Sequence, residues 1–281
     1  MAQAGVIGTD AAARAEGRRL SVTQIRIVTV VAIVVCWEAL AFLGHMGVLY
    51  NDVIPSSWKI VYAVWNEVAA ADFYRDLYFT FAAHIVGFIT GSAIAVALGI
   101  AMGVNPVLRK ALEPYLNAIG STPKIIFLPI LFLIFGTGIE SKMAKGALSA
   151  FFPVVFSTAL GMILINPVLL KVGKSFNLGH WQTVTKIYIP AMVNPIITGL
   201  RLGMAITVIG VLVAELKFAD GGLGFRLGNY YEQYRISEMY AVIVIIFILA
   251  AFANAGMTRL QAYANRHQGG AGAGSLSVAT N

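Results

Sequence analysis

Hydrophobic residues in this chain are gathered into six long runs that are separated by short polar segments. The runs cover about residues 25–43, 79–103, 118–136, 143–165, 192–214 and 239–258. Each run is close to the length of about 20 residues that a helix needs to cross the hydrocarbon core of a bilayer. The pattern predicts an all-α polytopic membrane protein with about six transmembrane helices.

The third run is the least regular, because Pro123 and Pro129 interrupt it. A spanning helix tolerates proline where neighbouring helices or side chains satisfy the freed backbone carbonyls. We therefore expect residues 118–136 to form an interior helix that can bend.

Residues 166–190 form a polar, lysine-bearing interruption between two apolar runs. Asn166 and Pro167 predict the start of a helix, with asparagine as the N-cap and proline at the first helical position. Apolar residues recur there at helical spacing and predict one apolar face, made of Val168, Leu169, Val172 and Phe176. Leu178 and Gly179 predict the end of this helix, because glycine tolerates the left-handed conformation that often follows one.

A second short helix is expected after Gly179 and before Pro190. Its apolar side would be made of Trp181, Val184, Ile187 and Tyr188. Two short helices at a membrane surface, joined by a glycine elbow, suit a protein that hands mechanical force to a partner. We expect this segment to be a cytoplasmic coupling loop.

The other connecting segments are shorter. Ser56 and Ser57 can cap a short helix that ends near Ala70 and carries interfacial aromatic residues (Trp58, Tyr62 and Trp65). Residues 215–238 contain a glycine cluster followed by tyrosines, which indicates a turn and a partly interfacial helix.

Both ends of the chain are predicted to be disordered cytoplasmic tails. Residues 1–20 are rich in Ala, Gly and Arg, and residues 265–281 are rich in Gly, Ala and Ser. Neither has enough apolar surface to fold alone. Residues 21–264 would then be one six-helix transmembrane domain.

Composition agrees with a membrane protein and excludes several other classes. The 281 residues are 58% hydrophobic and only 12% charged, about half the charged fraction of a soluble domain. A single cysteine, Cys36, excludes an internal disulfide and a multi-thiolate metal site. The net charge of +7 is scattered over loops rather than gathered in a stripe, so we expect no nucleic-acid partner.

The distribution of Lys and Arg indicates the orientation in the membrane. With the N-terminus in the cytoplasm, eleven of these residues lie inside and seven outside, with Lys124 and Arg201 left out because they lie within runs. The seven outer residues are Lys59, Arg75, Lys142, Lys145, Lys217, Arg226 and Arg235. An even number of spans returns the C-terminus to the cytoplasm, so both termini are expected inside.

No catalytic or cofactor motif is present. Gly173, Lys174 and Ser175 resemble the end of a phosphate-binding loop, but Val168 stands where its first glycine is needed and no strand precedes it. The four histidines show no metal-ligand spacing, and there is no nucleophile elbow. We expect neither an enzyme, nor a metal site, nor a cofactor.

Glu38, Arg201 and Lys124 are charged residues within the apolar runs, where a charge often marks function. Glu38 is either a gate or a hydrogen-bonded anchor. Arg201 either meets an anionic substrate or pairs with a neighbouring helix. Lys124 lies near the inner end of its run, where its long side chain can reach the interface.

The fifth run is dense in small residues. Gly199 and Gly203 form a pair that lets helix backbones approach closely. Thr198, Thr207 and Glu215 add polar groups along the same run, which is compatible with a path for a solute.

Taken together, the chain resembles the membrane-spanning permease subunits of bacterial ABC importers, in the branch that imports nitrate, taurine and alkane sulfonates. The resemblance covers about residues 30–262. The matching residues are Trp37-Glu38, Pro123-Lys124, Leu128-Pro129, Phe135-Gly136-Thr137-Gly138, Ser141-Lys142, Leu178-Gly179, Ile189-Pro190, Thr198-Gly199-Leu200-Arg201, Val213-Ala214-Glu215-Leu216 and Gly222-Leu223-Gly224.

One departure from that family stands out. Gly173, Lys174 and Ser175 occupy the positions where the family has Glu-Ala-Ala in its cytoplasmic loop. The acidic residue that helps to dock the ATPase is therefore absent. Either this chain docks through Lys171, Lys174 and its apolar face, or it pairs with a second permease that keeps the acid.

The resemblance implies a permease of the bacterial inner membrane, which dimerises as two copies or as a mixed pair. Its partners would be cytoplasmic ATP-binding subunits and an extracytoplasmic solute-binding protein. ATPase coupling is assigned to Lys171, Gly173, Lys174, Ser175, Leu178, Gly179 and Trp181. The path for a small, anionic solute is assigned to Pro123, Pro129, Thr198, Arg201, Thr207 and Glu215. An ion-coupled secondary transporter and a membrane scaffold remain the alternatives.

Overall fold

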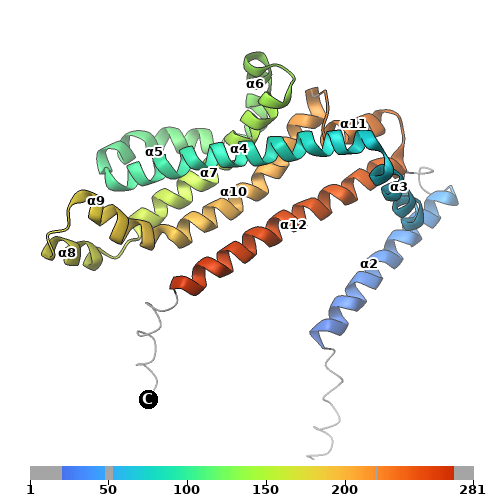
Figure 1. Cartoon of the computed structure of the whole chain (residues 1–281). Coiled ribbons are helices and arrows are strands. Elements are labelled where there is room, and N and C mark those ends of the chain that lie inside the picture. The colour runs from blue at the N-terminus through green and yellow to red at the C-terminus, as the bar shows by residue number, and fades with distance from the viewer. Residues whose placement is uncertain (1–20, 48–52, 219, 269–281) are drawn as a thin grey trace, which may run out of the picture. The chain divides into compact units, whose positions relative to one another are not determined.

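The computed structural model describes residues 21–47, 53–218 and 220–268, and every regular element in them is a helix (Figure 1). The prediction of an all-α protein is confirmed. The chain divides into two compact units, residues 1–62 and residues 63–281. The predicted tail at residues 1–20 lies outside the described residues.

The first unit contains helix α2 (Val22–His45). Its start is fixed by a capping box, in which Ser21 Oγ accepts from Gln24 N and Gln24 Oε1 accepts from Ser21 N. Gly44 is its only buried residue, so a helix of almost wholly apolar side chains is exposed. This is the arrangement expected of a helix that meets lipid or another membrane helix.

Two hydrogen bonds tie the segment after α2 back to it. Ser57 N donates to Glu38 Oε1 at 2.6 Å, and Trp37 Nε1 donates to the carbonyl of Pro55 at 3.0 Å. Ser57 begins helix α3 (Ser57–Ala69), close to the predicted bounds. The bond to Ser57 favours the anchoring role of Glu38 over the role of a gate.

The core of the second unit is built from three long helices, α4 (Ala71–Val104), α7 (Ile139–Ile163) and α10 (Ile189–Phe218). Glycines allow them to pack closely. A Cβ at Gly87 of α4 would lie 2.6 Å from the carbonyl oxygen of Met143 in α7. A Cβ at Gly199 of α10 would lie 2.8 Å from Cβ of Ser157 in α7. The predicted packing role of the glycine pair in the fifth run is confirmed.

The last helices cover one end and one side of this core. Helix α11 (Leu223–Glu232) packs against α10, and helix α12 (Ile236–Gln268) runs beside α10 and contacts α11 (Figure 1). Helix α12 continues to Gln268, four residues into the segment predicted as a tail.

The third apolar run is not one helix, so that prediction is wrong. Helix α5 (Pro106–Ser121) is followed by a 3-10 turn, η1 (Lys124–Phe127), and by helix α6 (Leu128–Phe135), with a bend of 94° between them. Thr122 adopts an extended conformation, as expected for a residue before proline. The described part has five helices long and apolar enough to span a membrane, or six if this bent pair is one span.

Two cations that were assigned to the outer loops belong to a helix interior. Lys142 and Lys145 lie in α7 and are only 1% and 3% exposed. The positive charge of the outer loops is therefore smaller than the sequence count suggests.

Candidate functional site

The coupling loop begins with helix α8 (Pro167–Ser175), as predicted. Asn166 Oδ1 accepts from Val168 N at 2.9 Å, and Pro167 occupies the first turn. The predicted apolar face is present and exposed, with exposed fractions of 46% to 76% for Val168, Leu169, Val172 and Phe176. Lys171 and Lys174 are also exposed. This short helix therefore presents apolar and cationic side chains that no described part of the chain covers.

The turn after α8 differs from the prediction. The left-handed residue is Asn177, with φ of 49°, rather than Gly179. The N–H groups of Leu178 and Asn177 donate to the carbonyls of Gly173 and Lys174, which closes the helix in a Schellman motif. Asparagine adopts this conformation more readily than most residues. The prediction of a turn at Gly179 is therefore wrong, because the chain turns at Asn177.

Gly173 packs α8 against the segment that follows. A Cβ at this position would lie 2.7 Å from Cδ1 of Ile187 and 3.4 Å from Cδ1 of Leu178. A side chain at this position would require the end of Ile187 to move. At Gly179, by contrast, a Cβ would meet nothing within 4 Å.

The second short helix does not end before Pro190, which is a further correction. Helix α9 (His180–Thr183) passes into a π turn, η2 (Val184–Tyr188), and then directly into α10. The N–H of Ile189 donates to the carbonyl of Val184, the spacing of a π turn. Trp181 is 78% exposed at the start of this rod. Helix α9 therefore has a continuous helical connection to a membrane-spanning helix, whereas α8 is joined to it by the turn at residues 176–179.

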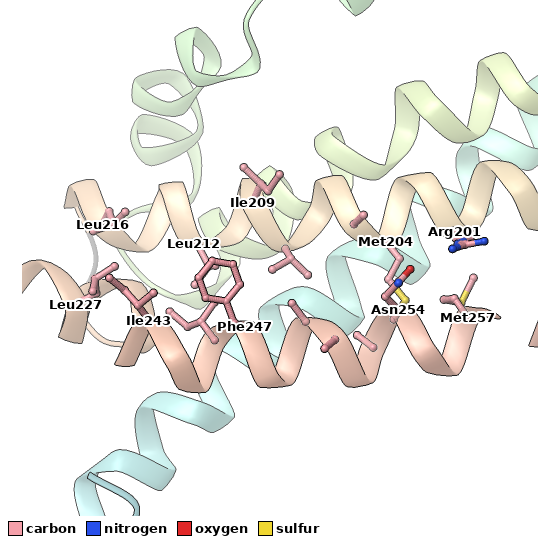
Figure 2. Close-up of a pocket in the computed structure, with 16 residues that line it drawn as sticks. Arg201, Met204, Ile209, Leu212, Leu216, Leu227, Ile243, Phe247, Asn254 and Met257 are labelled. Carbon is pink, nitrogen blue, oxygen red and sulfur yellow. The ribbon is translucent and has the colours of Figure 1, made fainter. Parts of the chain in front are cut away.

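A groove of about 580 Å³ runs between α10 and α12. Figure 2 shows Arg201 at one end, beside Asn254 and Met257, and Leu216 and Leu227 at the other. Most of the lining is apolar. Arg201 Nη1 donates to Gln261 Oε1 of α12 at 3.2 Å. Among the described residues, the hydrogen-bond partner of Arg201 is this neutral amide, and no carboxylate lies within ion-pair distance of its guanidinium.

Of the predicted path residues, Arg201 lines this groove and the others do not. Thr198 is exposed on α10, while Thr207 is fully buried and donates to the carbonyls of Gly203 and, weakly, Gly146. Pro123 and Pro129 are exposed at the bend between α5 and α6. Packing contacts account for Thr207, and its place in the path stays a prediction.

Glu215 lies at the far end of α10 and is completely buried. Its carboxylate accepts from Thr80 Oγ1 at 2.8 Å and from Gly224 N at 2.9 Å. Gly222 has φ of 111°, and a Cβ there would collide with this carboxylate. Lys142 Nζ donates to the carbonyl of Gly221 at 2.9 Å. Glu215 thus fixes the turn before α11, and its predicted place in the path stays untested.

A second polar cluster holds α11 itself. The guanidinium of Arg226 contacts Glu67 at 2.7 Å, Asp72 at 3.0 Å and Asp76 at 3.1 Å. Burial acts to lower the pKa of Arg226, but the hydrogen bonds that its guanidinium donates to these carboxylates outweigh burial, and the pKa is raised. Tyr230 also donates to Glu67. Burial, aided by that carboxylate, raises the pKa of Tyr230 to about 12.

Sequence reasoning missed this cluster. Its carboxylates lie in α3 and α4, more than 140 residues before Arg226, and no local spacing indicates such a pairing. A metal site is not indicated either, because the described residues contain no group of three or more His, Cys, Asp or Glu side chains placed to hold an ion.

Comparison with known proteins adds what the geometry alone does not show. The family described as binding-protein-dependent transport system inner membrane component matches residues 91–269, more than half of the chain. A protein of Bacillus subtilis (strain 168), named as the aliphatic sulfonates transport permease SsuC, is 26% identical, over 77% of this chain and 78% of its own.

Two further relatives carry other substrates in their names. The taurine transport system permease protein TauC of Escherichia coli (strain K12) is 29% identical, over 70% of this chain and 69% of its own. The nitrate import permease protein NrtB of Leptolyngbya laminosa is 24% identical, over 78% of this chain and 79% of its own.

A solved structure shares the fold. A chain of the MetNI methionine ABC transporter, in an inward-facing conformation, superposes with a TM-score of 0.56 at 20% identity. The match covers 74% of this chain and 97% of that chain. The predicted six-span permease architecture therefore corresponds to a known fold.

Proposed function

Because the chain belongs to the family of binding-protein-dependent transport inner membrane components, we propose that it forms, as one of a pair, the path for a small anion across the bacterial inner membrane. Members of this family are multi-pass permease subunits of ABC importers and are not enzymes. The family implies a separate ATPase chain and a solute-binding protein as partners. An ion-coupled transporter that works alone is not favoured.

Arg201 is the observation that carries the choice of an anion. Its guanidinium stands at the end of an apolar groove, and its partner there is a neutral amide. A cation in a spanning helix without a counter-charge marks a place where a negatively charged group is stabilised. The names of the three relatives specify sulfonates, taurine and nitrate, and each of these carries a negatively charged group with several oxygens.

ATPase coupling rests on α8. Its exposed apolar face and its two exposed lysines, Lys171 and Lys174, fit a groove on a soluble partner that combines apolar and acidic groups. When the ATPase subunits close on ATP, they push α8 and α9, and the push passes through η2 into α10. The transport cycle is then a rigid-body switch between two arrangements of packed helices. The proposal requires α8 and both termini to lie in the cytoplasm.

The second subunit of the pair is proposed to be another copy of this chain. Docking through Lys171 and Lys174 removes the need for an acid at position 173. A mixed pair with an acid-bearing permease is the alternative, and the mass of the purified membrane assembly separates the two.

The test is reconstitution in proteoliposomes with the ATPase and binding-protein partners. ATP-driven uptake of taurine, methanesulfonate and nitrate is compared between wild type, Arg201→Gln and Lys110→Met, which removes an exposed lysine of α5. We expect Arg201→Gln to lose uptake and Lys110→Met to keep it. Equal uptake in all three would remove Arg201 from the path, and uptake without the ATPase would refute the proposed energy source.

A further inference from the structure

Lys145 is a buried cation without a counter-ion. It lies about 9 Å along α7 from the first residue of that helix, inside a predicted membrane span, and is 3% exposed. Among the described residues, its ammonium donates one hydrogen bond, to Ser149 Oγ on the same helix, at 3.3 Å. Among the described residues no carboxylate lies within ion-pair distance of it. An ammonium in such surroundings is costly unless something neutralises it.

The nearby Lys142 is a second buried lysine of α7, but its charge is balanced by other groups. Lys142 is as deeply buried, but it donates to a backbone carbonyl at 2.9 Å. Four carboxylates also act on its charge, those of Glu215, Asp220, Asp76 and Glu140. Three residues later the chain provides no such group for Lys145.

The other charge that acts on Lys145 has the same sign. Lys124, in the η1 turn, exerts Coulomb repulsion on it. The ammonium of Lys124 donates to the carbonyl of Gly120 and lies 5.0 Å from the ring centroid of Phe152. Lys145, Ser149 and Phe152 follow each other at four- and three-residue spacing, so they share one face of α7. Two cations and a hydroxyl therefore gather between α7 and the bend.

We propose that Lys145, Lys124 and Ser149 form an intramembrane binding site for a small oxyanion, such as a sulfonate or nitrate. An anion here would neutralise the two lysines and accept hydrogen bonds from both ammonium groups. Ser149 Oγ accepts a hydrogen bond from Lys145. Its hydroxyl donates to no other group in the described structure, so it can donate to the anion. Three donors match the three oxygens of a nitrate or sulfonate group.

The bend between α5 and α6 gives this site a route of access. Non-helical backbone at membrane depth occurs where it is buried in protein or lines a water-filled cavity. Lys124 is only partly buried in that bend, and Pro123 beside it is exposed. A closely packed α10 covers the other side, because a Cβ at Gly210 would collide with Ser149. The anion therefore reaches Lys145 past Lys124.

This inference rests on the proposed anion specificity, but its test does not depend on transport. The purified permease–ATPase complex, without ATP, is heated in sodium nitrate or sodium methanesulfonate and, at equal ionic strength, in sodium gluconate. The two small anions are expected to raise the unfolding midpoint of wild type, Lys145→Arg and Lys110→Met. In Lys145→Met and Ser149→Ala, the concentration for half of the effect should rise roughly 10- to 100-fold, as expected for loss of a charge-assisted hydrogen bond.

Parallel uptake measurements separate this site from the proposed function. If Lys145→Met responds to nitrate and methanesulfonate as wild type does, the site is refuted, and wild-type uptake still decides whether the chain carries anions. A wild-type complex that shows no anion-dependent shift also refutes the site. If the shift depends on Lys145 but the wild type imports none of the anions, the binding site stands and the proposed function fails.

Discussion

The contact between Gly173 and Ile187 allows a direct test of how α8 is joined to the membrane helices. Replacing Gly173 with leucine adds side-chain atoms where a Cβ alone would lie 2.7 Å from Cδ1 of Ile187. Ordinary carbon contacts lie at roughly 3.5–4.0 Å, so the leucine forces Ile187 into another rotamer or the two segments apart by about 1 Å. Overpacking of this kind costs about 1–3 kcal/mol, which weakens docking of α8 on η2 roughly 5- to 150-fold.

The assay is uptake per ATP hydrolysed in proteoliposomes, together with amide hydrogen exchange of α8. Gly173→Leu is expected to lower uptake per ATP and to speed exchange of α8. Adding Ile187→Ala removes the opposing side-chain atoms and should restore part of both. Gly173→Ala is a mild control, because the far end of Ile187 can rotate away. If Gly173→Leu couples like wild type, with α8 still protected from exchange, the contact does not transmit force.

Gly179→Leu is expected to leave the thermal unfolding midpoint of the isolated permease unchanged, since a Cβ there meets nothing within 4 Å; a fall in uptake per ATP would then report a contact with the ATPase. Arg226→Met strands the buried carboxylate of Glu67 and should cost about 3–5 kcal/mol of unfolding free energy, whereas an unchanged unfolding curve would contradict the pairing. The pKa of Tyr230 is raised from its model-compound value of 10.0 to about 12, so the stability it contributes is complete below pH 10 and lost as the pH rises to 12; Tyr230→Phe should flatten this loss relative to wild type. Among the described residues, neither ring nitrogen of the buried His84 has a hydrogen-bond partner. His84→Leu is therefore expected to raise the free energy of unfolding by about 1–3 kcal/mol, and a lower thermal unfolding midpoint would reveal a partner for the imidazole.

Local sequence signals predicted the features that local physics decides. The length of the apolar runs located the long helices, and Asn166 with Pro167 located the start of α8. The same Asn–Pro signal at Asn105 and Pro106 starts α5, where the Asn105 side chain caps the helix. Most of that helix was missed because no element was assigned to residues 104–117, between the second and third apolar runs.

Features that depend on contacts across the fold were not predictable in this way. Gly179 looked like the turn residue, but the Schellman bonds of α8 place the turn at Asn177. Lys145 counted as an outer cation, although packing of α10 against α7 buries it. The three carboxylates around Arg226 come from elements far away along the chain. Sequence spacing carries no information about such encounters.

The unbroken rod from Trp181 to Lys217 has a mechanical consequence. Glycines bring it close to α7 at Gly199, Gly203 and Gly210, and Gly203 lies about 33 Å from its first residue and about 21 Å from its last. A stiff beam that pivots at such a contact swings its two ends in opposite senses. If the helix pivots at Gly203, moving its Trp181 end aside by about 3 Å moves its Lys217 end by roughly 1.9 Å the other way. A movement that opens the path on one side of the bilayer would then close the path on the opposite side, because the same rigid helix moves at both ends.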